Sequence, residues 1–287
     1  MTTPKYFTPR SIIEATHLLS KYGVKSRIIA GGTDLVVQMK KNQALPQYIV
    51  NIGGIRELDF ITYDKSSGLR IGALTTLDSL GKSSLVQSKF KILAQAAGML
   101  GSPTIRRQAT IGGNLCNAAP SADTAPALIV LGARVKITGI AGDKIVPVED
   151  LCTGPGQTCI GSGEMLLEIQ IPGLPSHCGA VYLKHKRTQG ADIAIAGAAA
   201  LVTLAGDVLK EVKIALAAVA PTPIRARQAE EILKGKKPDA KLLEEAGKMA
   251  STEARPIDDI RASADYRRKL VKVLVKRAVK QAIEQAR

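Results

Sequence analysis

Short apolar runs separated by polar and glycine-containing turns predict a chain of mixed helices and strands. A capping box formed by Ser11 and Glu14 opens the first predicted helix. The apolar runs at 27–30 and 48–52 are short enough to be strands, and an amphipathic helix that begins at Thr33 lies between them. The first fifty residues therefore predict a small β-α-β unit.

The middle of the chain alternates strands and helices. Residues 60–74 have the pattern of a hairpin with a Ser-Ser-Gly turn. Residues 101–126 are rich in Gly, Pro and Thr and are predicted to form a loop. The other elements predicted here are helices from about 75, over 88–100 and near 124–131, and strands at 133–138 and 165–171.

The stretch "GLPSHCG", residues 173–179, is typical of a domain boundary, and the chain changes character after it. Residues 193–220 predict a β-hairpin that turns at Ala205-Gly206-Asp207. Three helices are then expected near 224–234, 239–250 and 265–285, and one face of the last carries Leu270, Leu274, Ala278 and Ala282.

Two glycine pairs precede predicted helices or lie in predicted loops. Gly31 and Gly32 follow the first predicted strand, and Gly112 and Gly113 lie in "TIGGNLC". Backbone N–H groups at a strand-to-helix junction point outward unpaired and, with the helix dipole, attract an anion, most often phosphate. Two such loops can hold the two phosphates of a dinucleotide from opposite sides. The alternative for the first pair is an ordinary tight turn with Thr33 as the helix cap.

Charge and composition narrow the function classes. The 287 residues carry a formal net charge of +15, but three Phe, six Tyr and no Trp leave few platforms for stacking bases, so we expect no nucleic-acid partner. Neither glycine pair forms G-x-G-x-x-G after a strand, so the usual nicotinamide-binding fingerprint is absent. No G-x-x-x-x-G-K-[ST] motif is present either, so a nucleotide triphosphatase is not favoured. The first residues lack the apolar core of a secretory signal and no stretch suits a membrane span, so we expect a cytoplasmic protein.

The cysteines and histidines do not form a metal-ligand pattern. The four cysteines are irregularly spaced without a C-x-x-C pair, and no His has Cys, Asp or Glu arranged beside it as a ligand set. We therefore predict no metal site in this chain. The cysteines are Cys116, Cys152, Cys159 and Cys178.

The basic residues are densest at 255–287, where ten Lys or Arg stand against four Asp or Glu. This stretch predicts either a solvated helix face or a surface that docks an acidic partner. Arg106 and Arg107, beside the second glycine pair, are expected to hold the backbone or face a partner rather than bind phosphate. The docking candidates are Arg267, Arg268, Lys272 and Lys276.

Five motifs, in order along almost the whole chain, resemble one family. "IIAGGTDLVVQMK" and "SPTIRRQATIGGNLCNAAPSADTAPAL" look like the flavin-binding medium subunits of molybdenum hydroxylases, the carbon monoxide dehydrogenase and xanthine dehydrogenase type. "YLKHKRTQGADIAIAGAAA", "AAVAPTPIRARQAEEIL" and "DIRASADYRRKLVKVLVKRA" continue the resemblance. It implies an α+β fold: a two-subdomain FAD-binding α/β fold of the PCMH type at 1–56 and 57–174, then an antiparallel sheet with helices at 175–287.

The resemblance also implies a cofactor site. Asp123 matches an acidic residue that contacts the flavin or its ribityl chain, and Lys184 matches a lysine near the flavin ring. Without the resemblance, Asp123 is more readily an N-cap of the helix that follows, and Lys184 a solvated strand residue. The residues expected at the FAD pyrophosphate are Ala30, Gly31, Gly32, Thr33, Asp34, Leu35, Thr110, Gly112, Gly113 and Asn114.

By the same resemblance, the chain is the FAD-binding subunit of an oxidoreductase complex. A large subunit would carry the molybdenum cofactor and hydroxylate the substrate. A small subunit would carry [2Fe–2S] clusters that pass electrons to FAD and then to an external acceptor such as NAD or another oxidant. The alternative is a stand-alone flavin reductase of the UDP-N-acetylenolpyruvoylglucosamine reductase type, which shares the FAD-binding fold.

Overall fold

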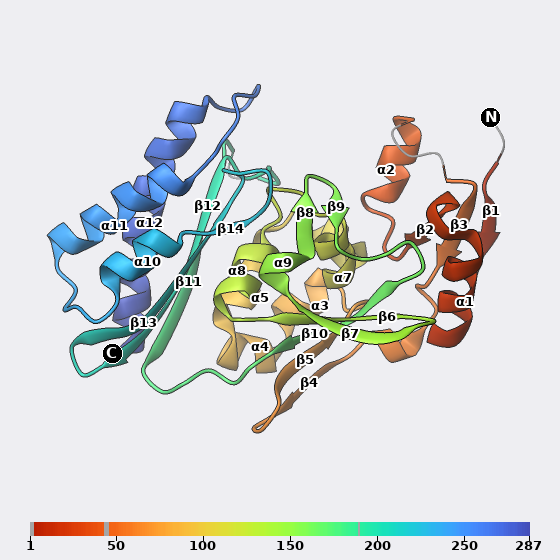
Figure 1. The fold of residues 1–287 in the computed structure, drawn as a ribbon, viewed down its shortest axis with the longest axis horizontal. Helices are drawn as coiled ribbons and strands as arrows, with labels where there is room; N and C mark the ends of the chain where they lie inside the picture. Colours follow the sequence, from red (N-terminus) through yellow and green to blue (C-terminus); the bar gives the residue numbers. More distant parts are fainter. Residues whose placement is uncertain (1–2, 43–45, 189) are drawn as a thin grey trace.

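A computed structural model describes residues 3–42, 46–188 and 190–287 of the chain (Figure 1). Three main sheets follow one another along the sequence, and the expected mixture of helices and strands is confirmed. The three sheets take their strands from 5–51, 61–171 and 178–225. The domain limits at 56 and 174 stay a prediction. None of the helices in the described ranges is long and apolar enough to cross a membrane.

The first sheet is parallel and has the order β1-β3-β2. Helix α1 begins after Ser11, whose hydroxyl accepts a hydrogen bond from the Glu14 amide, as the capping box predicts. Gly23 ends the helix at a φ of 50°. The elements are β1 (Lys5–Phe7), α1 (Ile12–Tyr22), η1 (Gly23–Lys25), β2 (Ser26–Ile29), α2 (Leu35–Lys40) and β3 (Tyr48–Asn51).

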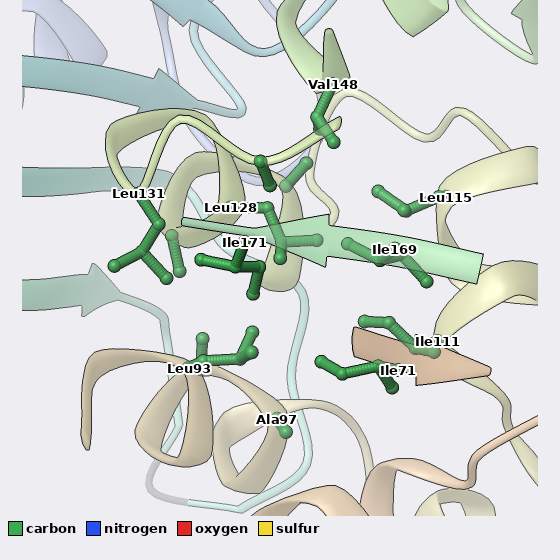
Figure 2. Close-up of a cluster of buried hydrophobic side chains, with 14 of the residues drawn as sticks. Ile71, Leu93, Ala97, Ile111, Leu115, Leu128, Leu131, Val148, Ile169 and Ile171 are labelled. Atoms are coloured by element: carbon green, nitrogen blue, oxygen red, sulfur yellow. The ribbon is translucent and has the colours of Figure 1, made fainter. Parts of the chain in front are cut away.

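The second sheet is antiparallel, with the order β4-β5-β10-β6-β7. Figure 2 shows its core, where Ile71, Ile169 and Ile171 from β5 and β10 meet Leu93 and Leu128 from helices α5 and α8. The strands are β4 (Ile61–Asp64), β5 (Gly68–Gly72), β6 (Arg134–Gly139), β7 (Gly142–Pro147) and β10 (Met165–Ile171), with the small pair β8 (Cys152–Gly154) and β9 (Gln157–Thr158). The helices are η2 (Arg56–Leu58), α3 (Leu77–Lys82), α4 (Ser84–Lys89), α5 (Lys91–Met99), α6 (Pro103–Gln108), α7 (Ile111–Cys116), α8 (Thr124–Val130) and α9 (Val148–Leu151).

The third sheet, β11-β12-β13-β14, is antiparallel and has helices on both faces (Figure 1). Because side chains alternate along a strand, Tyr182 and Ala199 join the core of the second sheet, whereas Val181 and Ala198 pack with the C-terminal helices. The elements are β11 (Cys178–His185), β12 (Ala196–Ala205), β13 (Val208–Ala217), β14 (Ile224–Arg225), α10 (Arg227–Leu233), α11 (Ala240–Glu253) and α12 (Ala264–Ala286).

The expected loop at 101–126 is wrong, because it contains α6, α7 and the start of α8. Ser102 and Thr110 cap α6 and α7, and Pro103 occupies the first turn of α6. Each of these two helices has only six residues, too few to show a helical period in the sequence. Strands β1, β7, β8, β9 and β14 were not predicted, and the helix expected at 88–100 is two helices, α4 and α5.

The expected hairpins at 60–74 and 193–220 and the three C-terminal helices are confirmed. Of the docking candidates expected on α12, Arg267 is wrong because its side chain is buried, whereas docking through Arg268, Lys272 and Lys276 stays a prediction. Arg267 is buried, and one of its guanidinium nitrogens donates to the carbonyl of Ile195 at 2.6 Å. Lys272 and Lys276 both pair with Glu244.

Close packing of α12 on β11 generates a stability prediction. A Cβ atom at Gly179 would lie 2.0 Å from the Ala282 carbonyl oxygen, so the helix must move away to accept Gly179→Ala. We expect this variant to lose about 1–3 kcal/mol of unfolding free energy in a urea titration. The matched control is Gly98→Ala in α5, where no atom lies within 4 Å and alanine should stabilise the helix by about 0.5–1 kcal/mol. If the urea midpoint of Gly179→Ala equals that of the wild-type protein, this close packing is contradicted.

Candidate functional site

A cleft with a volume of about 790 Å³ lies where the first and second sheets and β11 meet. Its size falls in the range of about 300–1,000 Å³ that ligand pockets occupy. Its lining includes every residue that the sequence singled out for a ligand: Ala30, Gly31, Gly32, Thr33, Asp34, Leu35, Thr110, Gly112, Gly113, Asn114, Asp123 and Lys184. The structure therefore brings together positions that are up to 154 residues apart in the chain.

The first glycine pair joins the two walls of the cleft. A Cβ atom at Gly31 would lie 1.7 Å from the Gln108 carbonyl oxygen, so only glycine allows the end of α6 to approach this closely. Gly32 has a φ of 70°, which is the left-handed backbone conformation that residues with a Cβ atom rarely adopt. Both glycines are thus required by the backbone itself.

The amides of the first loop are available to a ligand. Within the described residues, no backbone N–H from Gly31 to Leu35 donates a hydrogen bond to a protein acceptor. The expected cap by Thr33 is wrong, since α2 begins at Leu35 with Asp34 at the N-cap position and no side-chain capping bond. Consecutive free amides form an anion-binding concavity.

The second glycine pair is used differently from the first. The Gly112 amide donates to the Ala73 carbonyl at 3.0 Å, and a Cβ atom at Gly112 would lie 2.7 Å from that oxygen. The Gly113 amide donates to the Thr110 hydroxyl oxygen, and the Asn114 amide to the Thr110 carbonyl. The amides from Gly112 to Asn114 are therefore already satisfied, and Gly112 lets α7 pack closely against Ala73, the residue that follows β5.

Three polar side chains bridge the two loops. The Asn117 side-chain amide donates to the Asp34 carboxylate at 3.0 Å, and the Gln38 amide donates to the Asn117 oxygen at 3.2 Å. Burial raises the pKa of the Asp34 carboxyl. Asn117 and Gln38 also line the cleft and were not predicted, because their roles depend on partners 79 and 83 residues away.

A buried ion pair also belongs to the lining of the cleft. The Lys184 ammonium lies 2.7 Å from the Asp123 carboxylate, and the two side chains are only 3% and 5% exposed. Lys184 also donates to the Met99 carbonyl at 3.3 Å, and the Tyr182 phenol donates to Asp123 at 2.8 Å. Burial raises the pKa of the Asp123 carboxyl, and the charge and hydrogen bond of Lys184 oppose that rise.

The alternative roles for these two residues are wrong. Asp123 occupies the N-cap position of α8, but its side chain makes no capping bond because it is directed to Lys184 and Tyr182. Lys184 is not a solvated strand residue. Arg106 holds the backbone, as expected, by donating to the carbonyls of Leu100 and Gly101.

The cleft shows no sign of a metal centre. Among the residues that the structure describes, no group of three or more His, Cys, Asp or Glu side chains is placed to hold a metal ion. The four cysteines are free thiols, and only Cys116 among them lines the cleft. The ligand chemistry offered here is that of backbone amides, polar side chains and one neutralised ion pair.

Two family models match the chain in succession. Residues 2–174 match the FAD-binding domain in molybdopterin dehydrogenase, and residues 180–282 match the C-terminal domain of the carbon monoxide dehydrogenase flavoprotein. The chain belongs to the family of FAD-binding medium subunits of molybdenum hydroxylases. As a member of this family it is a flavoprotein subunit of an oxidoreductase, and the FAD-binding domain is its own.

Individual relatives cover the whole medium subunit. The carbon monoxide dehydrogenase medium chain of Afipia carboxidovorans is 36% identical over 98% of this chain and 97% of its own length. The xanthine dehydrogenase FAD-binding subunit of Escherichia coli O157:H7 is 31% identical over 98% and 96%. A solved structure of carbon monoxide dehydrogenase from Hydrogenophaga pseudoflava, described as lacking the Mo-pyranopterin moiety of its molybdenum cofactor, superposes with a TM-score of 0.96, at 33% identity over 99% and 98%.

The cleft of this medium subunit fits FAD. The free amides from Gly31 to Leu35 suit a pyrophosphate. A Cβ atom at Gly32 would lie 3.3 Å from side-chain atoms of Ile29 and Val36, in a left-handed backbone conformation that strains any residue but glycine. The Asn114 oxygen accepts from the Thr124 hydroxyl at 2.5 Å, which leaves the Asn114 amide nitrogen without a partner among the described residues. The donor set of the cleft is therefore that of an anionic dinucleotide site.

The buried ion pair generates a second prediction. Lys184→Met leaves the Asp123 carboxylate buried without its counter-ion, and we expect a loss of about 3–5 kcal/mol of unfolding free energy at neutral pH. Without Lys184 the Asp123 pKa rises further above its unfolded value. The folded state then binds protons more tightly than the unfolded state, so the variant loses stability as pH rises through the folded pKa.

Denaturant titrations at several pH values, with Lys184→Met and Lys184→Met/Asp123→Asn side by side, measure this effect. The double variant should recover part of the loss and should lack the added pH dependence, because it has no carboxyl group to titrate. Equal stability of wild type and Lys184→Met at every pH would contradict a buried, compensating pair.

Proposed function

We propose that this medium subunit binds FAD with the pyrophosphate on the amides of Gly31 to Leu35. The flavin end of the cofactor then lies toward Asp123 and Lys184. The observation that carries the proposal is the set of unpaired amides in a cleft that contains every expected site residue. The second loop contributes through Thr110, Gly113 and the Asn114 side chain rather than through free amides.

We further propose that the subunit works within a three-subunit enzyme. A large subunit carries the molybdenum cofactor and a small subunit carries [2Fe–2S] clusters, whereas the described part of this chain has no metal-ligand cluster. Bound FAD would supply the relay between those clusters and an external acceptor such as NAD or another oxidant. The free thiols support a cytoplasmic location.

The contribution of this chain is to hold and orient the cofactor. Amides bind the pyrophosphate, and the bridge from Asp34 through Asn117 to Gln38 ties the two loops together. Because Asp123 compensates the charge of Lys184, the pair presents no net charge to the flavin. A stand-alone reductase is disfavoured, since the C-terminal part also matches the hydroxylase flavoprotein.

A glycine substitution tests the cofactor assignment. Gly32→Asp introduces a negative charge into the loop proposed to hold the phosphates, and Coulomb repulsion should weaken FAD binding at least about tenfold, or about 1.4 kcal/mol. The matched control is Gly206→Asp, which imposes the same left-handed strain at a φ of 58° in the turn between β12 and β13. Fluorescence titration of the apo-protein with FAD measures both. An equal loss of FAD affinity in the two variants, or no loss of FAD affinity in Gly32→Asp, would contradict the phosphate site.

Subunit reconstitution tests the larger role. The isolated chain should hold FAD and accept electrons from an artificial donor or a reduced nicotinamide, yet hydroxylate no substrate. Mixed with the molybdenum and iron–sulfur subunits from its own source, it should enter a stable complex that elutes as one species. Reduction of a UDP-sugar enol ether by the chain alone would overturn the subunit assignment in favour of the reductase.

A further inference from the structure

Tyr182 on β11 is a fully buried tyrosine beside the proposed flavin end of the cleft. Its hydroxyl donates to one oxygen of Asp123 at 2.8 Å, while Lys184 donates to the other oxygen at 2.7 Å. Burial and the neighbouring Asp123 charge raise the pKa of the phenol well above its usual value, so the phenol keeps its proton and acts as the donor. Tyr182 itself does not line the cleft.

The ring of Tyr182 has little freedom to turn away. Gly197 of β12 lies against it, and a Cβ atom at Gly197 would come within 2.7 Å of the phenol oxygen. The absence of a side chain at Gly197 thus makes room for the hydroxyl, and the strand pairing places that glycine opposite Lys184. Backbone, ring and carboxylate form one fixed unit between the third sheet and α8.

We propose that Tyr182 is a positioning residue: it holds the Asp123 carboxylate against Lys184 and so sets the net charge that the site presents to the flavin. The inference rests on the proposed placement of FAD. With the phenol in place, both carboxylate oxygens have a donor and the pair is neutral. Without it, the carboxylate loses one donor, protonates at a higher pH, and leaves the Lys184 charge uncompensated.

Few other groups can produce this effect. The largest effects of charged or titratable groups on the pKa of the Asp123 carboxyl come from Lys184, then Tyr182 and Lys186. Helix α8 carries no ionisable side chain, and α5 carries only Lys91 at its N-terminal end. The pH response of the pair is therefore assigned to the Asp123 carboxyl.

The test is a spectroelectrochemical titration of the FAD-loaded subunit over a range of pH. Because an uncompensated cation stabilises anionic reduced flavin, Tyr182→Phe should have a higher midpoint potential than wild type, and the difference should grow as pH falls. Asp123→Asn should also have a higher potential, but without the added pH dependence. Adding Tyr182→Phe to Asp123→Asn should change nothing further, because the two act through one carboxylate.

The matched control is Tyr63→Phe in β4, which removes a phenol that makes no hydrogen bond among the described residues. Its potential should follow wild type at every pH. The proposal is overturned if the midpoint potential of Tyr182→Phe has the same pH dependence as that of wild type. It is also overturned if Tyr63→Phe shifts the midpoint potential by the same amount as Tyr182→Phe. Asp123→Asn remains informative even if Tyr182→Phe folds poorly, since an unchanged potential there would also overturn it.

A second readout does not need the cofactor. The carbon-13 resonance of the Asp123 carboxyl in apo-protein should titrate at a higher pH in Tyr182→Phe than in wild type, and an identical titration would overturn the role of Tyr182. If wild-type protein takes up no FAD, the proposed function fails, while this titration still decides whether Tyr182 controls the pair.

Discussion

The cleft depends on the close backbone approach that glycine permits at Gly31, where there is no side chain. Because no Cβ is present, the carbonyl of Gln108 approaches the first loop closely enough that any other residue would clash with it at 1.7 Å. This approach joins the loop after β2 to the end of α6, two residues before Thr110 caps α7. The two glycine pairs come together through backbone packing, and the cleft forms between them.

The two walls then have different chemistry. The first loop leaves its amides unpaired, which is costly in a partly buried site unless a ligand or water satisfies them. In the second loop, the amides from Gly112 to Asn114 donate to Ala73 and Thr110, so this loop contributes side chains. The ion pair of Asp123 and Lys184 brings no net charge, which concentrates the attraction for anions on the first loop. The strongly basic composition does not decide the site, since several of the cations of α12 pair within the chain.

Much of this arrangement could be predicted from the sequence, and the exceptions share a cause. The hairpins, the long helices and the first glycine loop follow local rules, and all twelve expected site residues line the cleft. Local rules could not separate Gly112 from Gly32, because the role of Gly112 depends on its approach to Ala73. Nor could they find Tyr182, whose partner Asp123 is 59 residues away. Helices α6 and α7 are too short to show a period.

A crystal structure of the protein with FAD bound would locate the cofactor directly. We expect pyrophosphate oxygens within about 3 Å of the amide nitrogens between Gly31 and Leu35. We also expect the flavin end of the cofactor beside the Asp123–Lys184 pair. Phosphates held elsewhere, with those amides facing only water, would contradict this placement of the cofactor.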